Sequence, residues 1–286
     1  MRGRSLALPL VRILLRIARP ASREARAATF FTGGAAVLAG SVLADSATEH
    51  YRGSFRNPAM VLPLLSASAS LIINGGGGSF SRKTADVVHV AAGAVGLGGL
   101  GFHAWNVGRQ TGGYRLGNLL YKAPLGAPGA LVLTGLLGAI AGALRESRAG
   151  AVVPRLVTGR AAGAVVAFGL AGTVAEAGLL HFRGAFHNPA MWLPVSIPPL
   201  TALSLARDVA RAIPSPATPY LLAMTATLGL AGAAFHAWGV SRNMGGWRNW
   251  RQNLLAGPPI PAPPSFTGLA IAGFGALLLL KGRTHG

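Results

Sequence analysis

His50-Tyr-Arg-Gly-Ser-Phe-Arg-Asn-Pro-Ala-Met60 decides the fold, because the chain repeats it as His181-Phe-Arg-Gly-Ala-Phe-His-Asn-Pro-Ala-Met191, at an offset of 131 (181 − 50). A second block follows each copy. Phe102-His-Ala-Trp105 returns as Phe235-His-Ala-Trp238, at an offset of 133 (235 − 102). Behind it, Arg109-x-x-Gly-Gly-Tyr-Arg115 matches Arg242-x-x-Gly-Gly-Trp-Arg248. Self-similarity at a nearly fixed period is the signature of a structural unit used more than once. The sequence therefore predicts two tandem copies of one unit.

The composition indicates an integral membrane protein. The chain has 286 residues, of which 51% are hydrophobic and only 12% charged, against about 25% charged in soluble domains. The charges are 26 Lys and Arg against 7 Asp and Glu. Such an excess would suggest nucleic acid for a soluble protein. Here the arginines lie between apolar segments, so we expect anionic lipids as partners and no nucleic acid. The absence of Cys excludes disulfides, thiolate metal sites and Cys-attached haem.

The apolar segments predict an all-α fold of about eight transmembrane helices, arranged as two tandem four-helix repeats. Most of the segments approach the ~20 residues that a bilayer requires. We expect the helices at 27–44, continuing to 50, and at 59–73, 84–105, 129–144, 161–181, 190–213, 218–238 and 266–280. The predicted domains are a basic segment 1–26, a first repeat 27–145, a basic linker 146–160 and a second repeat 161–286.

The N-terminal segment is predicted to be an amphipathic helix on the membrane surface. Its arginines fall within one arc of a helical wheel: Arg12, Arg16, Arg19, Arg23 and Arg26. Such a helix lies on an anionic membrane with its apolar face inserted. A cleaved signal peptide is the alternative, but Arg12 interrupts the apolar run that a signal peptide requires.

The distribution of Lys and Arg predicts the topology. If the chain has eight spans and its N-terminus is inside, the inside connections hold about twice as many Lys and Arg as the outside connections. An excess of Lys and Arg on the cytoplasmic side is what sets the orientation of membrane proteins. We therefore expect both termini in the cytoplasm of a bacterium, with the protein in its inner membrane. The duplicated loops would then face the outside. Alternatively, the second apolar segment of each repeat could be re-entrant, entering and leaving the membrane on the same side. The two repeats would then be inverted, and the excess of Lys and Arg on the inside would be smaller.

Four histidines occupy equivalent positions near the predicted outer face: His50, His103, His181 and His236. Imidazoles from two neighbouring helices can bind haem b from opposite faces of the iron, and they also suit copper, zinc or non-haem iron. The alternative is structural, since a histidine at a helix C-terminus can bind free carbonyls. His89 and His187 have no duplicated counterparts, so we interpret both as structural.

Two acids inside predicted spans are also equivalent, namely Asp45 and Glu176 (176 − 45 = 131). An ionisable group within a span is costly and suggests a function. The acids could be metal ligands, proton carriers or counter-charges for Arg52 and Arg183. Each precedes its histidine by five residues, about 140° around a helix, so acid and histidine do not share a face.

The remaining duplicated motifs lie in connections. Arg109, Arg115, Arg242 and Arg248 flank Gly-Gly pairs, which permit a turn with positive φ. These arginines could anchor the loops at the interface, or could hold haem propionates or a quinone. The paired Asn-Pro-Ala motif resembles the boxes of aquaporins over those residues alone, while the surrounding plan differs. Helix capping by Asn, with Pro at the first helical position, is a sufficient explanation.

These features predict a multi-pass subunit of a redox complex that transports electrons. The paired histidines would hold haem b or another metal near the outer face, between an extrinsic redox partner and the quinone pool. Nothing indicates a catalytic residue of a self-contained hydrolase or ATP-driven pump. A solute or ion transporter built from an internal duplication is the first alternative. A membrane anchor or assembly subunit without a cofactor is the second.

Overall fold

The structure, a computed structural model, describes residues 22–122, 124, 126–148 and 158–281. These residues contain helices and no strand. Most of the predicted basic N-terminal helix, and much of the predicted linker 146–160, lie outside them. The helices are α2 (Arg23–Arg52), η1 (Pro58–Val61), α3 (Leu62–Gly75), α4 (Arg82–Gly108), α5 (Leu116–Tyr121), α6 (Gly126–Arg148), α7 (Gly159–Arg183), η2 (Pro189–Val195), α8 (Ile197–Arg211), α9 (Thr218–Ser241), η3 (Gly246–Asn249), α10 (Trp250–Ala256) and α11 (Pro264–Leu280).

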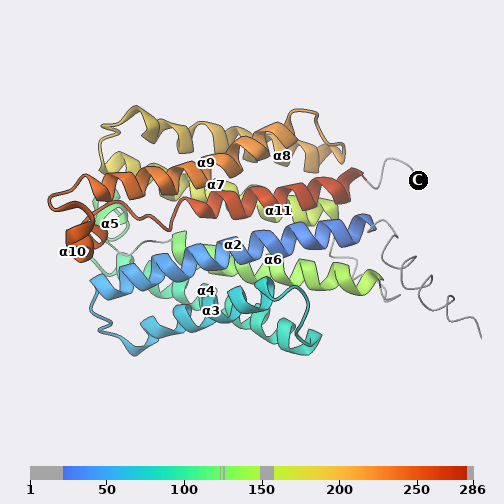
Figure 1. The fold of residues 1–286 in the computed structure, drawn as a ribbon, viewed down its shortest axis with the longest axis horizontal. Helices are drawn as coiled ribbons and strands as arrows, with labels where there is room; N and C mark the ends of the chain where they lie inside the picture. Colours follow the sequence, from blue (N-terminus) through green and yellow to red (C-terminus); the bar gives the residue numbers. More distant parts are fainter. Residues whose placement is uncertain (1–21, 123, 125, 149–157, 282–286) are drawn as a thin grey trace, which may run out of the picture.

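The principal helices run along the long axis in alternating directions, with α5 and α10 at one end (Figure 1). The connections that carry the duplicated motifs all lie at that end, which we call the motif end. The start of α2 and the end of α11 lie at the opposite end. Within the described residues, seven helical segments are long and apolar enough to cross a membrane. The chain is therefore an all-helical protein with the character of a multi-pass membrane protein.

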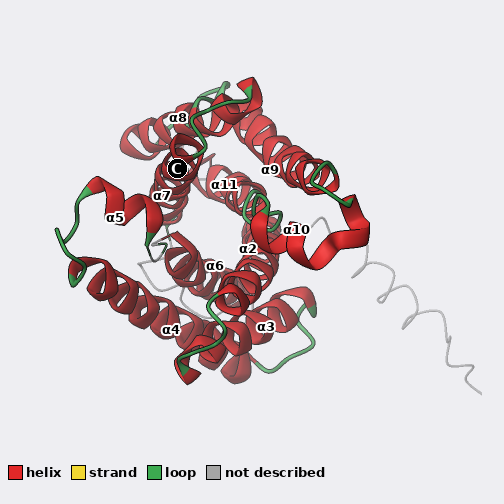
Figure 2. Cartoon of the chain, turned by 90° about the vertical axis from the view of Figure 1, so that its left-hand side faces the viewer, coloured by secondary structure: helices red, strands yellow, loops and turns green. Residues whose placement is uncertain are grey.

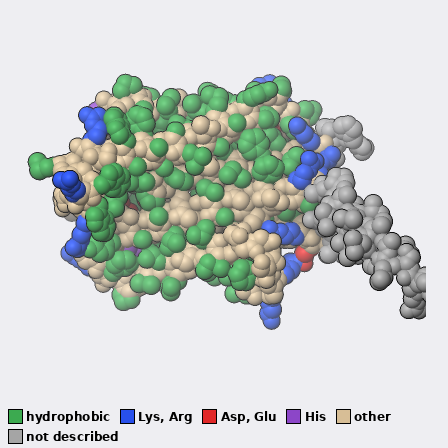
Figure 3. Space-filling model, viewed as in Figure 1, with side chains coloured by type: hydrophobic (Ala, Val, Ile, Leu, Met, Phe, Trp, Pro, Cys, Tyr) green, Lys and Arg blue, Asp and Glu red, His purple; other side chains and the backbone are tan. Residues whose placement is uncertain are grey.

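The surface supports that character. Large apolar side chains along the helices are exposed, among them Leu65, Val90, Phe168, Leu203 and Leu230. The visible Lys and Arg side chains gather toward the two ends, with apolar side chains between them (Figure 3). A broad apolar band between two charged rims matches a bilayer and its two interfaces.

The eighth expected span, α11, differs from the others. It has 17 residues, fewer than the seven candidate segments. Most of its side chains are buried, because it packs extensively on α2 and also against α7 and α9. The apolar side chains of α11 therefore pack in the protein core at least as much as they contact lipid. Sequence hydropathy cannot separate these two environments, since both favour apolar side chains.

The two halves have the same pattern of helix contacts. In the first half, α2 and α4 both pack on α6, and α3 packs on both α2 and α4. In the second half, α7 and α9 pack on α11, and α8 packs on both α7 and α9. Figure 2 shows these two groups of four side by side. Individual contacts also correspond, because Gly96 packs against the Pro128 carbonyl as Gly229 packs against that of Pro263.

The junction between the halves is asymmetric. α2 and α11 are in close contact, and a Cβ at Gly34 would lie 2.5 Å from the Gly268 carbonyl oxygen. At the corresponding junction α6 and α7 touch much less. The equivalent positions there are Val165 (165 − 34 = 131) and Leu133 (268 − 133 = 135). Small residues allow backbones to approach closely, whereas these larger side chains separate the helices.

Gly34→Ala is therefore expected to destabilise the protein by about 1–3 kcal/mol, the usual range for overpacking a tight contact. Thermal unfolding in detergent measures the change. Gly33→Ala is the matched control, because the nearest atom to its added Cβ, on Ile271, would be 3.7 Å away. Equal melting temperatures for the two variants would contradict the close α2–α11 contact.

Candidate functional site

The turn after each histidine of the first motif is built from the same contacts. The His50 carbonyl accepts a hydrogen bond from the Phe55 N–H (3.1 Å), and the two rings meet edge to face. Ser54 and Phe55 both have positive φ, at 57° and 46°. The second copy has the same geometry at His181, Ala185 and Phe186. Positive φ in two consecutive non-glycine residues is unfavourable, so the contacts around the histidine hold this turn in place.

The next turn is held by the motif asparagines. The Asn57 side chain accepts a hydrogen bond from the Ala59 N–H, and Asn188 accepts one from Ala190, both at 2.9 Å. Pro58 and Pro189 follow as the first residues of η1 and η2. The capping interpretation of Asn-Pro-Ala is confirmed. The motif starts a helical turn and needs no further role.

All four duplicated histidines bind a backbone carbonyl through Nδ1. The pairs are His50 with Met60 (2.7 Å), His103 with Pro124, His181 with Met191 (2.9 Å) and His236 with Pro259 (2.7 Å). A carbonyl oxygen only accepts, so each Nδ1 carries the hydrogen and a neutral ring keeps a lone pair on Nε2. No hydrogen bond among the described residues uses any of these four Nε2 atoms.

The histidines come together in two pairs, one in each half. His50 on α2 and His103 on α4 are close enough to interact electrostatically, and so are His181 on α7 and His236 on α9. All four are partly exposed in the isolated protein. Each half therefore presents two imidazoles from two helices at the motif end.

The two equivalent acids lie near the junction of the halves, close enough for Asp45 to feel the charge of Glu176. Asp45 interacts electrostatically with Glu176 as well as with Glu49 and Arg52. The Glu176 side chain faces Gly126 at the start of α6, where the positive end of the helix dipole favours an anion. The ion pair with Arg52 is made by Glu49 rather than by Asp45. Arg183, the other expected counter-charge, lies over the Tyr121 ring at 5.5 Å.

The Gly-Gly loops adopt the predicted turn. Gly112, Gly113, Gly245 and Gly246 have φ of 88°, 59°, 81° and 50°. The Asn118 and Asn253 side chains donate hydrogen bonds to carbonyls of their own loops. The loop arginines are exposed: Arg109, Arg115, Arg242 and Arg248. Among the described residues, no hydrogen bond or ring contact joins them to the histidines, and Arg242 instead lies over Trp238 at 4.7 Å.

Two features of the motif end were missed from the sequence. The connections contain the short helices α5 and α10, which contact the opposite half. Arg52 donates hydrogen bonds to the Leu254 and Gly257 carbonyls across the junction. The two short helices could have been found from the sequence Asn-Leu-Leu, which occurs in both connections, at 118–120 and 253–255, and marks equivalent helical turns. The pattern gives no indication of which half each turn contacts.

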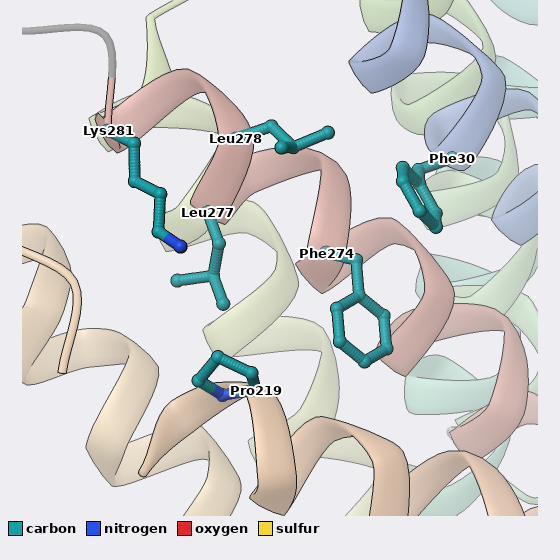
Figure 4. Close-up of a pocket in the computed structure, with 6 residues that line it drawn as sticks. All are labelled: Phe30, Pro219, Phe274, Leu277, Leu278 and Lys281. Carbon is teal, nitrogen blue, oxygen red and sulfur yellow. The ribbon is translucent and has the colours of Figure 1, made fainter. Parts of the chain in front are cut away.

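Two pockets within the described residues lie at different ends of the molecule. One, of about 320 Å³, is lined by Ala234, Phe235 and Trp238, which flank His236 in the sequence. The other, of about 160 Å³, lies where α2, α9 and α11 meet, toward the opposite end. Figure 4 shows its lining, with Phe30, Phe274 and Pro219 around an apolar space. The three residues that line the first pocket share one exposed face of α9, and none of them is a candidate site residue.

Within the described residues, no three side chains of the types His, Asp and Glu gather as a metal site. The four duplicated histidines come in pairs, from two helices in each half. Comparison of the sequence with protein-family models, curated proteins and solved structures finds no match. The fold defines an all-helical, multi-pass membrane protein, and its function has to be inferred from the paired histidines and acids.

Proposed function

We propose that the chain crosses the membrane eight times as two tandem four-helix repeats, with both termini in the cytoplasm of a bacterium and the protein in its inner membrane. The matching helix contacts of the halves support the repeats. The distribution of Lys and Arg supports the orientation. In this arrangement the motif end faces the outside, and anionic lipids contact the arginines at the rims.

The paired histidines, in this proposal, hold haem b, and the protein is an electron-transferring subunit of a redox complex. The observation that carries it is the hydrogen bond from each Nδ1 to a carbonyl. Metal-ligating histidines almost always donate their other ring N–H in this way, because the bond fixes the tautomer and orients Nε2. The same four bonds also serve the structural role of fastening the connections.

A pair of imidazoles fits haem better than a bare metal ion. Structural zinc takes four protein ligands and catalytic zinc takes three, whereas haem needs only the axial ligands from the protein because the macrocycle supplies the others. His50 with His103, and His181 with His236, would be these axial pairs. Haem, when bound, supplies a reversible one-electron carrier. The chain supplies the ligands, their orientation and an apolar surrounding.

The motif end would also receive the partners. Exposed Trp105, Tyr114, Trp247 and Trp250, together with the exposed arginines there, give an amphipathic surface that fits an extrinsic redox subunit. The pocket on α9 that Ala234, Phe235 and Trp238 line contains two aromatic rings, which would suit a quinone head group. Electrons would then pass between the extrinsic subunit and the quinone pool through the histidine-held centres.

Electron paramagnetic resonance of the oxidised protein in its native membranes tests the ligand set. Two imidazole ligands predict low-spin ferric haem. A high-spin signal would mean that one imidazole is not a ligand, and a sample without any haem signal would contradict the proposal. Iron analysis of the same membranes distinguishes non-haem iron from an empty site.

A transporter is the second candidate, favoured by the closeness of Asp45 and Glu176 near the junction of the halves. Ionisable groups within spans commonly mark ion and proton pathways. This function predicts solute flux in liposomes that falls when both acids are replaced by their amides, in a protein without a chromophore. If the protein is instead an anchoring subunit, we expect neither bound haem nor solute flux.

A further inference from the structure

Three polar atoms inside the first half have no hydrogen-bond partner among the described residues: Ser66 Oγ, Ser70 Oγ and His89 Nδ1. Ser70 and His89 are only 0% and 5% exposed. The Asn74 side chain, 6% exposed, binds the Ser70 carbonyl (2.8 Å). Buried polar groups are nearly always hydrogen-bonded, so a set of unpaired ones calls for a ligand or for water.

The repeat indicates that these residues lie on facing sides of α3 and α4. Ser66, Ser70 and Asn74 are four residues apart and share one face of α3. The register of the second half shows what lies opposite them, because Thr201 on α8 binds Thr225 on α9 at 2.7 Å. Because α8 and α9 run in opposite directions, the helical period then places position 205, one turn further along α8, near position 222. The equivalent positions of the first half are Asn74 (205 − 131) and His89 (222 − 133).

The second half carries apolar side chains at three of the four equivalent sites. The fourth, Thr201, is the equivalent of Ser70 (201 − 131), and its hydroxyl is paired with that of Thr225. Leu222 packs on Gly273 of α11 as His89 packs on Gly138 of α6, at the offset of 135 (273 − 138). The equivalents of Ser66 and Asn74 are Ile197 and Leu205. The fold therefore accepts apolar side chains here. The polar side chains of the first half are not required for packing, and their unpaired atoms cost stability.

Charged or polar residues lie toward both ends of the half from this group. His89 interacts electrostatically with Asp86 of its own helix and with Arg145 of α6. Arg82 pairs with both Asp86 and Glu146 at that exposed end. In the other direction, Ser66 follows Met60 by six residues (66 − 60), about 9 Å at 1.5 Å per residue. The Met60 carbonyl accepts the hydrogen bond of His50.

We propose that Ser66, Ser70, Asn74 and His89 line a hydrated proton path from the end that carries Asp86 and Glu146 toward the His50–His103 pair. Water bridges polar groups that do not touch, and here it would satisfy the unpaired atoms. A proton that arrives at Asp86 or Glu146 passes through water to His89 Nδ1. The ring then releases its Nε2 proton to the next water, so no net charge accumulates, and rotation of the ring restores the starting tautomer before the next proton arrives. This path is a feature of the first half alone and does not depend on haem.

Proton flux into liposomes tests the proposal. The purified protein is reconstituted with a pH-sensitive dye inside, and a potassium gradient with valinomycin drives protons in. His89→Leu and Asn74→Leu introduce the residues that the second half carries, so both variants are expected to fold. We expect flux above that of protein-free liposomes, reduced about tenfold in each variant, as a barrier higher by about 1.4 kcal/mol would give. Thr225→Val, which breaks the polar pair of the second half, is the matched control and should conduct normally.

Wild-type flux no greater than that of protein-free liposomes overturns the path, as does undiminished flux in His89→Leu. An equal loss in Thr225→Val also overturns it, because the path would then not belong to the first half. Absorbance of the same samples reports haem independently. Flux without haem would refute the proposed redox function and leave the path standing, whereas haem without flux would do the reverse.

Discussion

His103→Ala is expected to remove the haem of the first half and to leave that of the second half in place. The substitution would delete one of the two imidazoles that would hold the haem of the first half, leaving only His50 to bind it. The protein should then hold about half of its haem, because each half uses its own pair. Haem extracted from a known amount of protein measures the ratio. The absorbance band of the haem that remains in the second half is an internal check that the variant has folded.

His236→Ala should give the mirror result, and the double variant should hold no haem. His187→Ala is the matched control, since His187 is an exposed histidine whose Nδ1 also binds a carbonyl, that of Gly184 at 2.9 Å. Its haem content should not change. Full haem content in the double variant would show that the pairs only fasten the loops.

Asp208→Ala is expected to lower the free energy of unfolding by about 2–3 kcal/mol, the scale for leaving buried partners of a charged group unsatisfied. Asp208 is 1% exposed and lies on α8. It accepts hydrogen bonds from the Ser215 N–H (2.9 Å) and from the Thr218 hydroxyl (2.6 Å). These bonds fasten the α8–α9 connection. Unfolding in detergent, followed by circular dichroism, measures the loss.

Asp208→Asn keeps an accepting oxygen and should lose less stability than Asp208→Ala. Arg207→Ala, an exposed neighbour, should change the free energy of unfolding by no more than about 0.5 kcal/mol, as surface substitutions usually do. Equal stability of Asp208→Ala and the wild type would show that the connection does not depend on this carboxylate.

The duplication made much of the helix order predictable, because equivalent stretches start and stop at equivalent residues. Asn57 and Asn188 mark helix starts chemically, and the Gly-Gly pairs mark turns. The expected helices correspond to α2, α3, α4, α6, α7, α8, α9 and α11, mostly with ends shifted by a few residues. The largest difference is at 190–213, which divides into the 3-10 helix η2 and the α-helix α8. Such ends depend on cap geometry that a hydropathy pattern does not contain.

The relations between the halves were not predictable in the same way. The closeness of Asp45 to Glu176 depends on how α2 and α7 are rotated about their axes, and the helical period gives no absolute rotation. The tight α2–α11 contact depends on Gly34 and Gly268, two among 41 glycines. His89 was interpreted as structural because it lacks a duplicated histidine, yet this same difference from Leu222 gives it a role in the proposed path.

The absorbance spectrum of the protein, oxidised and then reduced with dithionite, tests the central claim most directly. It should be recorded first on native membranes and then on the detergent-purified protein, so that loss of cofactor during purification is visible. We expect a reduced α-band of haem b, with haem equivalent to one group per histidine pair. A colourless protein in both preparations, without stoichiometric iron, would contradict the assignment of the paired histidines as haem ligands.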